Sequence, residues 1–184
     1  MNDEELIERT LAGDKEAFGR LAQKYQDRVY NLALPIVGNA EDALDVVQDT
    51  FLQALSHLAN FRRSSRFYTW LYRIAYNSAV GALRKRRKTS SIDAATEEFG
   101  DSFEAQIDAP DAEARRQDDA RLLREALEKL PVEYRAPLVM REIDGANYEQ
   151  IAEALDVPVG TVRSRLHRAR AALRESLERV GVGG

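Results

Sequence analysis

A basic segment near the C-terminus has the side chains that contact nucleic acid. Between Thr161 and Arg174 the sequence contains no aspartate or glutamate. Its polar and basic side chains include Arg163, Ser164, Arg165, His167, Arg168 and Arg170. Guanidinium groups pair with phosphate oxygens and with base edges in the major groove, which is wide enough to admit one α-helix. The segment therefore predicts a helix that reads duplex DNA.

The apolar residues of the same segment predict how this helix is held. They recur at i, i+4, i+7 and i+11, at Val162, Leu166, Ala169 and Leu173. This spacing gives one buried stripe at about 100° per residue. Arg165 and Arg170 flank the stripe, and the other polar side chains point away from it. A solvated surface helix is the alternative, and the absence of acidic residues disfavours it.

The residues just before this helix predict a helix-turn-helix. Asn147 can cap a first helix, and Gln150 is placed to complete a capping box. Asp156 and Val157 then turn the chain. Pro158 suits the first position of the next helix, because its missing amide donor costs nothing there. In such a motif the second helix enters the major groove.

A second basic region precedes the middle of the chain. A loop at residues 61–66 carries Arg62, Arg63 and Ser64, and a helix is expected from Phe67 to about Lys88. Its inner face is expected to hold Phe67, Trp70, Leu71, Ile74, Ala75 and Ser78. Its outer side holds Thr69, Arg73, Tyr76 and Arg84, with Tyr72 and Asn77 at the margins. Cations beside exposed aromatic rings bind single-stranded nucleic acid. The alternative is that the tyrosines belong to the core and that the basic run only keeps the protein soluble. For Tyr72 and Tyr76 the sequence leaves both interpretations open.

An acidic patch is predicted on the helix that Asn39 can cap. The patch consists of Asp45, Gln48 and Asp49. Phe51 and Leu55 lie beside it and are expected to be buried. A patch of this kind is either a solvated face or a docking surface.

The other periodic segments also read as helices, and strand signals are absent. Helices are expected at residues 3–12, from Asp14 until Pro35 and Gly38 end the segment, at residues 122–130, and from Pro131 to Gly145. Residues 89–114 contain acidic side chains but no lysine or arginine, which predicts a flexible linker. We therefore expect an all-α fold with two small helical domains, residues 1–88 and 115–184, joined by this acidic linker.

Composition narrows the function classes. The 184 residues include no cysteine, which excludes disulfides and thiolate metal sites and fits a cytoplasmic location. The net charge of −4 does not exclude nucleic-acid binding, because the basic residues are clustered and the charge of the whole chain does not describe these local regions. The sequence has no P-loop and no dinucleotide fingerprint, the motifs that bind nucleotides. It has no apolar run long enough to suggest a membrane span. His57 and His167 lie far apart in the sequence, which disfavours a histidine metal site. We expect a binding protein rather than an enzyme, with no cofactor, no metal and no membrane span.

The ordered set of motifs resembles the extracytoplasmic-function (ECF) sigma factors, which are initiation factors of bacterial RNA polymerase in the sigma-70 family. The sigma E type is the most similar. The matching runs are Asp45 to Phe51, Phe67 to Asn77, Leu130-Pro131 with Tyr134-Arg135, and Pro158 to Arg170. They cover nearly everything outside the linker, and their order and spacing are more specific than a single helix-turn-helix.

The resemblance implies a role for each surface. The N-terminal domain would be sigma-2 and the C-terminal domain sigma-4. Asp45, Gln48 and Asp49 would dock on the clamp helices of the β′ subunit of core polymerase, and sigma-4 would contact the β-flap and read the minus-35 element. The melted minus-10 element would lie on Arg62, Arg63, Ser64, Tyr72, Arg73, Tyr76, Asn77 and Arg84, with one base flipped into a pocket. An anti-sigma factor is the expected regulatory partner, and a small stress or envelope regulon the expected target.

Some residues depart from the sigma E pattern, and two other functions stay open. Arg63, Ser64 and Arg66 stand where relatives often carry Gly, Asp and Ala, which leaves the base preference open. Gly81 weakens its helix by about 1 kcal/mol relative to alanine. A free-standing helix-turn-helix regulator would use residues 1–88 for dimerisation or sensing, and an adaptor would bind polymerase and RNA.

Overall fold

The structure, a computed structural model, describes residues 2–62, 65–92 and 121–179, and this part of the chain is helical throughout, with no strand. The N-terminal half contains α1 (Asp3–Leu11), α2 (Lys15–Val37), α3 (Ala40–His57), the short 3₁₀ helix η1 (Leu58–Asn60) and α4 (Phe67–Ile92). The C-terminal half contains a helix at residues 121–128, then α6 (Val132–Glu142), α7 (Tyr148–Leu155) and α8 (Val159–Arg179). The expected all-α class is confirmed.

Side-chain caps fix where the helices begin, at the predicted residues. Asp14 accepts hydrogen bonds from the Glu16 and Ala17 amides at the start of α2, and Asn39 accepts one from the Asp42 amide. Asn147 and Gln150 form a reciprocal capping box at the start of α7. These caps satisfy amide donors that have no partner within their helix.

One helix ends where the sequence predicts, and one ends later. α2 ends at Val37 before Gly38, as predicted, but Pro35 lies inside the helix, so its expected part in ending α2 is wrong. The end is set by Gly38, whose φ of +88° is the left-handed cap conformation that glycine adopts without steric cost. In contrast, α4 extends to Ile92 rather than Lys88.

The N-terminal core lies where α2, α3 and α4 pack together. Leu21, Val29 and Leu32 of α2 are fully buried, as are Leu71 and Ala75 of α4. From α3 the core receives a stripe of small or branched side chains, namely Ala43, Val46, Thr50 and Ala54. The small side chains allow α3 to approach its neighbours closely, while its remaining faces stay open.

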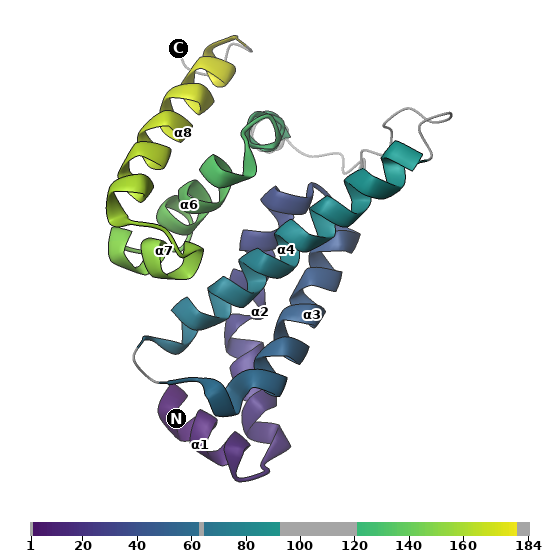
Figure 1. The fold of residues 1–184 in the computed structure, drawn as a ribbon, viewed down its shortest axis with the longest axis vertical. Helices are drawn as coiled ribbons and strands as arrows, with labels where there is room; N and C mark the ends of the chain where they lie inside the picture. Colours follow the sequence, from purple (N-terminus) through teal and green to yellow (C-terminus); the bar gives the residue numbers. More distant parts are fainter. Residues whose placement is uncertain (1, 63–64, 93–120, 180–184) are drawn as a thin grey trace, which may run out of the picture.

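The C-terminal helices pack on the N-terminal core. Figure 1 shows α7 lying beside the N-terminal half of α4, with α6 next to α7 and α8 on their far side. α7 contacts α4, α6 contacts α2, and one cluster of buried apolar residues runs through both halves of the chain. The predicted division at residues 88 and 115 stays a prediction, since residues 93–120 lie outside the described part of the chain.

Two leucine truncations in the N-terminal core test this packing. Leu21 is completely buried and Leu52 is 58% exposed. We expect Leu21→Ala to lower the free energy of unfolding by about 2–5 kcal/mol, because it leaves a cavity as well as removing apolar contact. Leu52→Ala makes the same chemical change on the surface and should shift it by less than about 0.5 kcal/mol. Urea denaturation followed by circular dichroism measures both, and equal losses would contradict the placement of α2.

Candidate nucleic-acid and protein-docking surfaces

The C-terminal helix α8 presents a basic face opposite a buried stripe, as the sequence predicts. Val162, Leu166 and Ala169 are fully buried, and Leu173 is half-buried. Arg163, Ser164, His167 and Arg168 are exposed side chains of the same helix, whereas Arg165 is half-buried. The periodicity therefore predicted the orientation of α8 correctly.

Two arginines of α8 contact α6 in addition to facing solvent. Arg170 forms an ion pair with Glu142, with 2.7 Å between Nη2 and Oε1. Arg168 Nη1 donates to the Tyr134 hydroxyl at 3.3 Å. Both arginines are exposed, so the Glu142 and Tyr134 contacts position the guanidinium groups without burying them.

The predicted outer side of α4 is partly exposed and partly covered. Arg73, Asn77 and Arg84 are exposed, while Tyr76 is half-buried. Thr69 and Tyr72 are buried, contrary to the expected outer and marginal positions. The cause is tertiary, because α7 and the segment after α6 cover this side of α4.

Tyr72 meets Asp144, which follows α6. Burial is the main reason why the pKa of the tyrosine hydroxyl is raised, and the neighbouring Asp144 raises it further. Burial also raises the pKa of the Asp144 carboxyl, while the tyrosine partly opposes that shift. Despite this proximity, neither Tyr72 Oη nor Asp144 Oδ2 has a hydrogen bond of regular geometry to the described residues. The interface thus contains two buried polar atoms that are poorly satisfied.

A small pocket lies at the N-terminal end of α4. Its volume is about 200 Å³, and its lining includes Asn60, Phe61, Arg62, Ser65, Thr69, Trp70, Arg73 and, from α7, Glu153. The rings of Phe61 and Trp70 are 5.2 Å apart between centroids. Cationic and aromatic side chains thus come together here, as expected for the loop. Arg63 and Ser64, also expected here, lie outside the described residues.

The exposed face of α3 is both acidic and apolar. Asp45, Gln48 and Asp49 are exposed, as predicted. Leu55 is 48% exposed, so its expected burial is wrong, and Phe51 is half-buried. The reason is that the Ala43, Val46, Thr50 and Ala54 stripe faces the core.

Sequence reasoning missed two exposed leucines on this helix. Leu44 is 60% exposed and Leu52 is 58% exposed. The signal was present, since residues 44, 48, 52 and 55 fall on one face, about opposite the small-residue stripe. Large apolar side chains around three polar ones are typical of protein contact surfaces.

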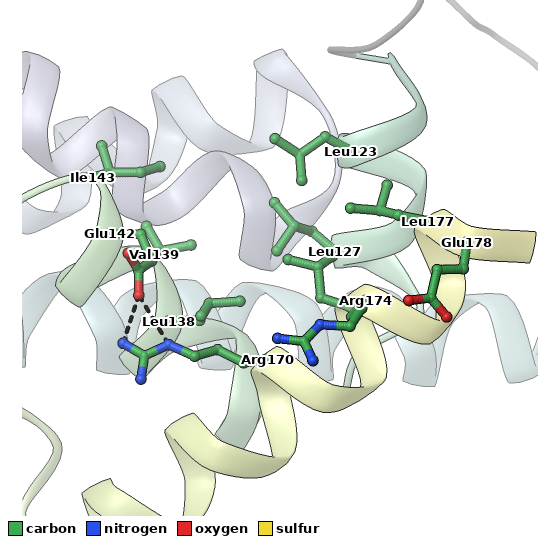
Figure 2. Close-up of a pocket in the computed structure, with 11 residues that line it drawn as sticks. Leu123, Leu127, Leu138, Val139, Glu142, Ile143, Arg170, Arg174, Leu177 and Glu178 are labelled. Atoms are coloured by element: carbon green, nitrogen blue, oxygen red, sulfur yellow. Dashed lines mark hydrogen bonds and ion pairs between the residues drawn. The ribbon is translucent and has the colours of Figure 1, made fainter. Parts of the chain in front are cut away.

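An apolar groove between α6, α8 and the helix at residues 121–128 was also missed. It encloses about 640 Å³. Figure 2 shows Leu123, Leu127, Leu138, Val139, Ile143 and Leu177 lining it, with Glu142, Arg170, Arg174 and Glu178 at its edges. No local sequence pattern could predict this groove, because the leucines that line it come from three separate segments.

Arg135 joins the two halves of the chain. Although charged, it is buried, and its guanidinium donates to the carbonyl oxygens of Pro35 and Ile36 at the end of α2. It also donates to the carbonyl oxygens of Glu128 and Leu130, the latter at 2.6 Å. Carbonyls at helix ends have no partner within the helix and carry partial negative charge, so they suit a buried cation.

Comparison with known proteins identifies the family. Residues 21–89 match the model of sigma-70 region 2, and residues 120–173 match that of sigma-70 region 4. The RNA polymerase sigma-H factor of Pseudomonas aeruginosa is 40% identical, with 96% of this chain and 94% of that protein covered. The ECF RNA polymerase sigma-E factor of Escherichia coli K12 is also 40% identical, with 94% and 93% covered. The chain belongs to the ECF sigma factors.

Two solved ECF-like structures share the fold of this sigma factor. CnrH, solved in complex with the cytosolic domain of CnrY, is 28% identical, with a TM-score of 0.72 and coverage of 96% of this chain and 97% of CnrH. The sigma factor RpoE of Bartonella quintana, solved with the anti-sigma factor NepR, is 26% identical, with a TM-score of 0.70 and coverage of 88% and 96%. The likeness spans both halves of the chain.

The described part of the sigma factor has no cluster of three histidine or acidic residues arranged to hold a metal ion. Among the same residues, no helix has the length and apolarity that a bilayer crossing requires. The region 2 match spans most of α2, all of α3 and most of α4, and the region 4 match includes most of α8. The DNA and polymerase contacts of individual residues stay predictions.

Replacing Arg135 tests whether it holds the two halves of the sigma factor together. Arg135→Met keeps much of the apolar volume but leaves buried helix-end carbonyls without their donor. We expect a loss of about 2–4 kcal/mol in the free energy of unfolding, because hydrogen bonds to charged groups are individually strong. Arg20→Met, the same change at an exposed arginine of α2, is the control. Equal thermal stability of the two variants would contradict the role of Arg135.

Proposed function

We propose that this ECF sigma factor directs core RNA polymerase to promoters through surfaces on α3, α4 and α8. The observation that carries the proposal is the combination, on one chain matching regions 2 and 4, of an open acidic and apolar face on α3 with basic faces on α4 and α8. Binding to polymerase and to two DNA elements needs three surfaces, and these three faces are the ones that we propose.

The α8 face would read the minus-35 element in the major groove. Arg163, Ser164, His167 and Arg168 are the proposed base-reading residues, and their exposure supports this. Arg165 and Arg170 flank them and would contact phosphates. Phosphate contacts set position and affinity, while each good base contact adds about 1–3 kcal/mol of discrimination.

The α4 face and the preceding loop would hold the melted minus-10 strand. Arg62, Arg73 and Arg84 would contact phosphates, and Tyr76 and Asn77 would meet bases. The pocket beside Trp70 is a suitable place for one flipped base, because an aromatic ring and cations border it. Arg63, Ser64 and Tyr72 belong to the same proposed surface, and Tyr72 could take part only after α7 moves away.

The α3 face would dock on the clamp helices of the β′ subunit. Asp45, Gln48 and Asp49 are proposed to make its polar contacts, and the exposed Leu44 and Leu52 would add apolar area. Such a mixture of apolar centre and charged rim is what protein interfaces use.

The apolar groove of the C-terminal half would take a helix of a protein partner. Its leucine lining and charged edges fit an amphipathic helix, which binds through one apolar face. We assign it to the β-flap during initiation. The solved relatives CnrH and RpoE are complexes with CnrY and NepR, which supports an anti-sigma factor as a second partner in a cytoplasmic setting.

Transcription with purified components tests these assignments. Sigma-free core polymerase is mixed with the protein, co-elution is measured, and run-off transcripts are counted from the promoter upstream of its own gene. Arg168→Ala should keep co-elution but lower transcript yield about tenfold, since one base contact is lost. Asp49→Ala should weaken co-elution itself.

The controls make the same substitutions elsewhere on the surface. Arg179→Ala lies near the C-terminal end of α8, and Asp27→Ala lies on α2. Both should behave as the wild type. If the protein ignores core polymerase and instead binds duplex DNA as a dimer, the sigma assignment fails and a free-standing regulator takes its place.

A further inference from the structure

Arg170 continues the proposed DNA-reading face of α8 toward the C-terminal end of the helix. At about 100° per residue, position 170 falls within about 20° of position 163, almost two turns earlier. Both arginines are exposed. Their surroundings differ, because Arg163 has no hydrogen bond or ion pair with another described residue, whereas Arg170 is held by two neighbouring helices.

Glu142, the last residue of α6, holds one edge of the Arg170 guanidinium. Its Oε1 atom accepts hydrogen bonds from Nη2 at 2.7 Å and from Nε at 3.2 Å. Tyr148, the first residue of α7, is the second neighbour. Hydrogen bonding to Glu142 first, and to Tyr148 next, raises the pKa of Arg170. The arginine thus lies between the end of α6 and the start of α7.

The far edge of the same guanidinium is open to a ligand. Its Nη1 atom has no hydrogen bond with another described residue, and Figure 2 shows this nitrogen pointing away from Glu142. The Arg170 side chain is 46% exposed. A guanidinium has five N–H donors, so those that face Glu142 leave others for the oxygens of a phosphate.

Glu142 has two opposing effects on a phosphate contact made by Arg170. A long arginine side chain loses rotamer freedom when it binds, and a side chain that is already held in place loses less. The carboxylate also repels a nearby phosphate, but water and salt screen this repulsion at an exposed site. Because Glu142 and Arg170 are both about half exposed, the screened repulsion is the smaller effect.

We propose that Glu142 is a positioning residue for the minus-35 contact, because it holds the Arg170 guanidinium with its open edge toward a phosphate of the DNA backbone. The proposal rests on the proposed function, which assigns Arg170 to a phosphate, and it adds a role for Glu142. Glu142 itself does not touch DNA. Phosphate contacts fix the register of a protein on the duplex, so Glu142 helps to set the register in which α8 reads bases.

Glu142→Asp separates positioning from charge. Aspartate keeps the negative charge, but its side chain is one methylene shorter and cannot hold Arg170 in the same place. If only the charge mattered, this variant would bind DNA as the wild type does. If Glu142 kept Arg170 away from DNA, the variant would bind more tightly. The proposal predicts weaker binding. Glu149→Asp, the same change at an exposed glutamate of α7, is the control.

The measurement uses holoenzymes formed from core polymerase and each variant. Their binding to a fluorescein-labelled fragment of the promoter upstream of the protein's own gene is followed by anisotropy at several salt concentrations, at a low temperature that keeps the duplex closed. Arg170→Gln should lower the affinity about two- to tenfold at low salt. It should also make the slope of log affinity against log salt less steep by about 0.9, as for one lost phosphate contact.

Glu142→Asp should resemble a weaker form of Arg170→Gln. We expect an affinity about two- to fivefold lower at low salt and a slope that is less steep by a smaller amount, because Arg170 still reaches the phosphate part of the time. In the Arg170→Gln background, Glu142→Asp should cause no further loss. Thermal unfolding of the free protein should not change, since an exposed ion pair contributes little stability.

The outcomes are distinct. Weaker binding of Glu142→Asp with a less steep salt slope, absent in the Arg170→Gln background, supports the proposal. Unchanged or tighter binding, an unchanged slope, an equal loss in Glu149→Asp, or loss of co-elution with core polymerase overturns it. Wild-type affinity and slope in Arg170→Gln overturn it as well. Failure of the proposed function appears separately, as absence of promoter-dependent transcripts from the wild-type holoenzyme.

Discussion

The buried guanidinium of Arg135 is the contact on which the arrangement of the two halves depends. A charge can be buried only where polar partners surround it, and here the partners are carbonyl oxygens at the ends of α2 and of the helix at residues 121–128. α2 is the central helix of the N-terminal core, while Arg135 itself belongs to α6. By linking these elements, one side chain fixes α6 against α2, and α7 then follows onto α4.

In that arrangement the α4 face can serve one of two contacts but not both together. In the closed chain the α4 face packs against α7, whereas in the proposed promoter complex it meets a melted strand. The faces of α3 and α8 behave differently, since their polar side chains are exposed in the closed form. On the proposed assignment, polymerase docking would not require prior opening, while minus-10 recognition would. Such an order would keep an acidic factor from non-specific sites until it is attached to polymerase.

Periodicity and caps were sufficient to predict the helices and the orientation of α8. Asp14, Asn39 and Asn147 cap helices as their side chains suggest, and the 162–166–169 stripe is buried. The errors in burial have a common cause. Tyr72 and Leu55 depend on which neighbour covers a helix face, and a period shows that a face is apolar or polar without showing what packs on it. The groove of Figure 2 and the Arg135 contacts join distant segments, so no local pattern contains them.

The distance between the two halves in the free and polymerase-bound protein tests the account most directly. Because the chain has no cysteine, Ala12→Cys and Ala171→Cys introduce one dye site on each half, at exposed alanines. The account predicts high transfer efficiency between the dyes in the free protein and a clear fall when core polymerase is added. An efficiency that is low in the free protein, or that does not change on binding core, would contradict the closed arrangement and its release.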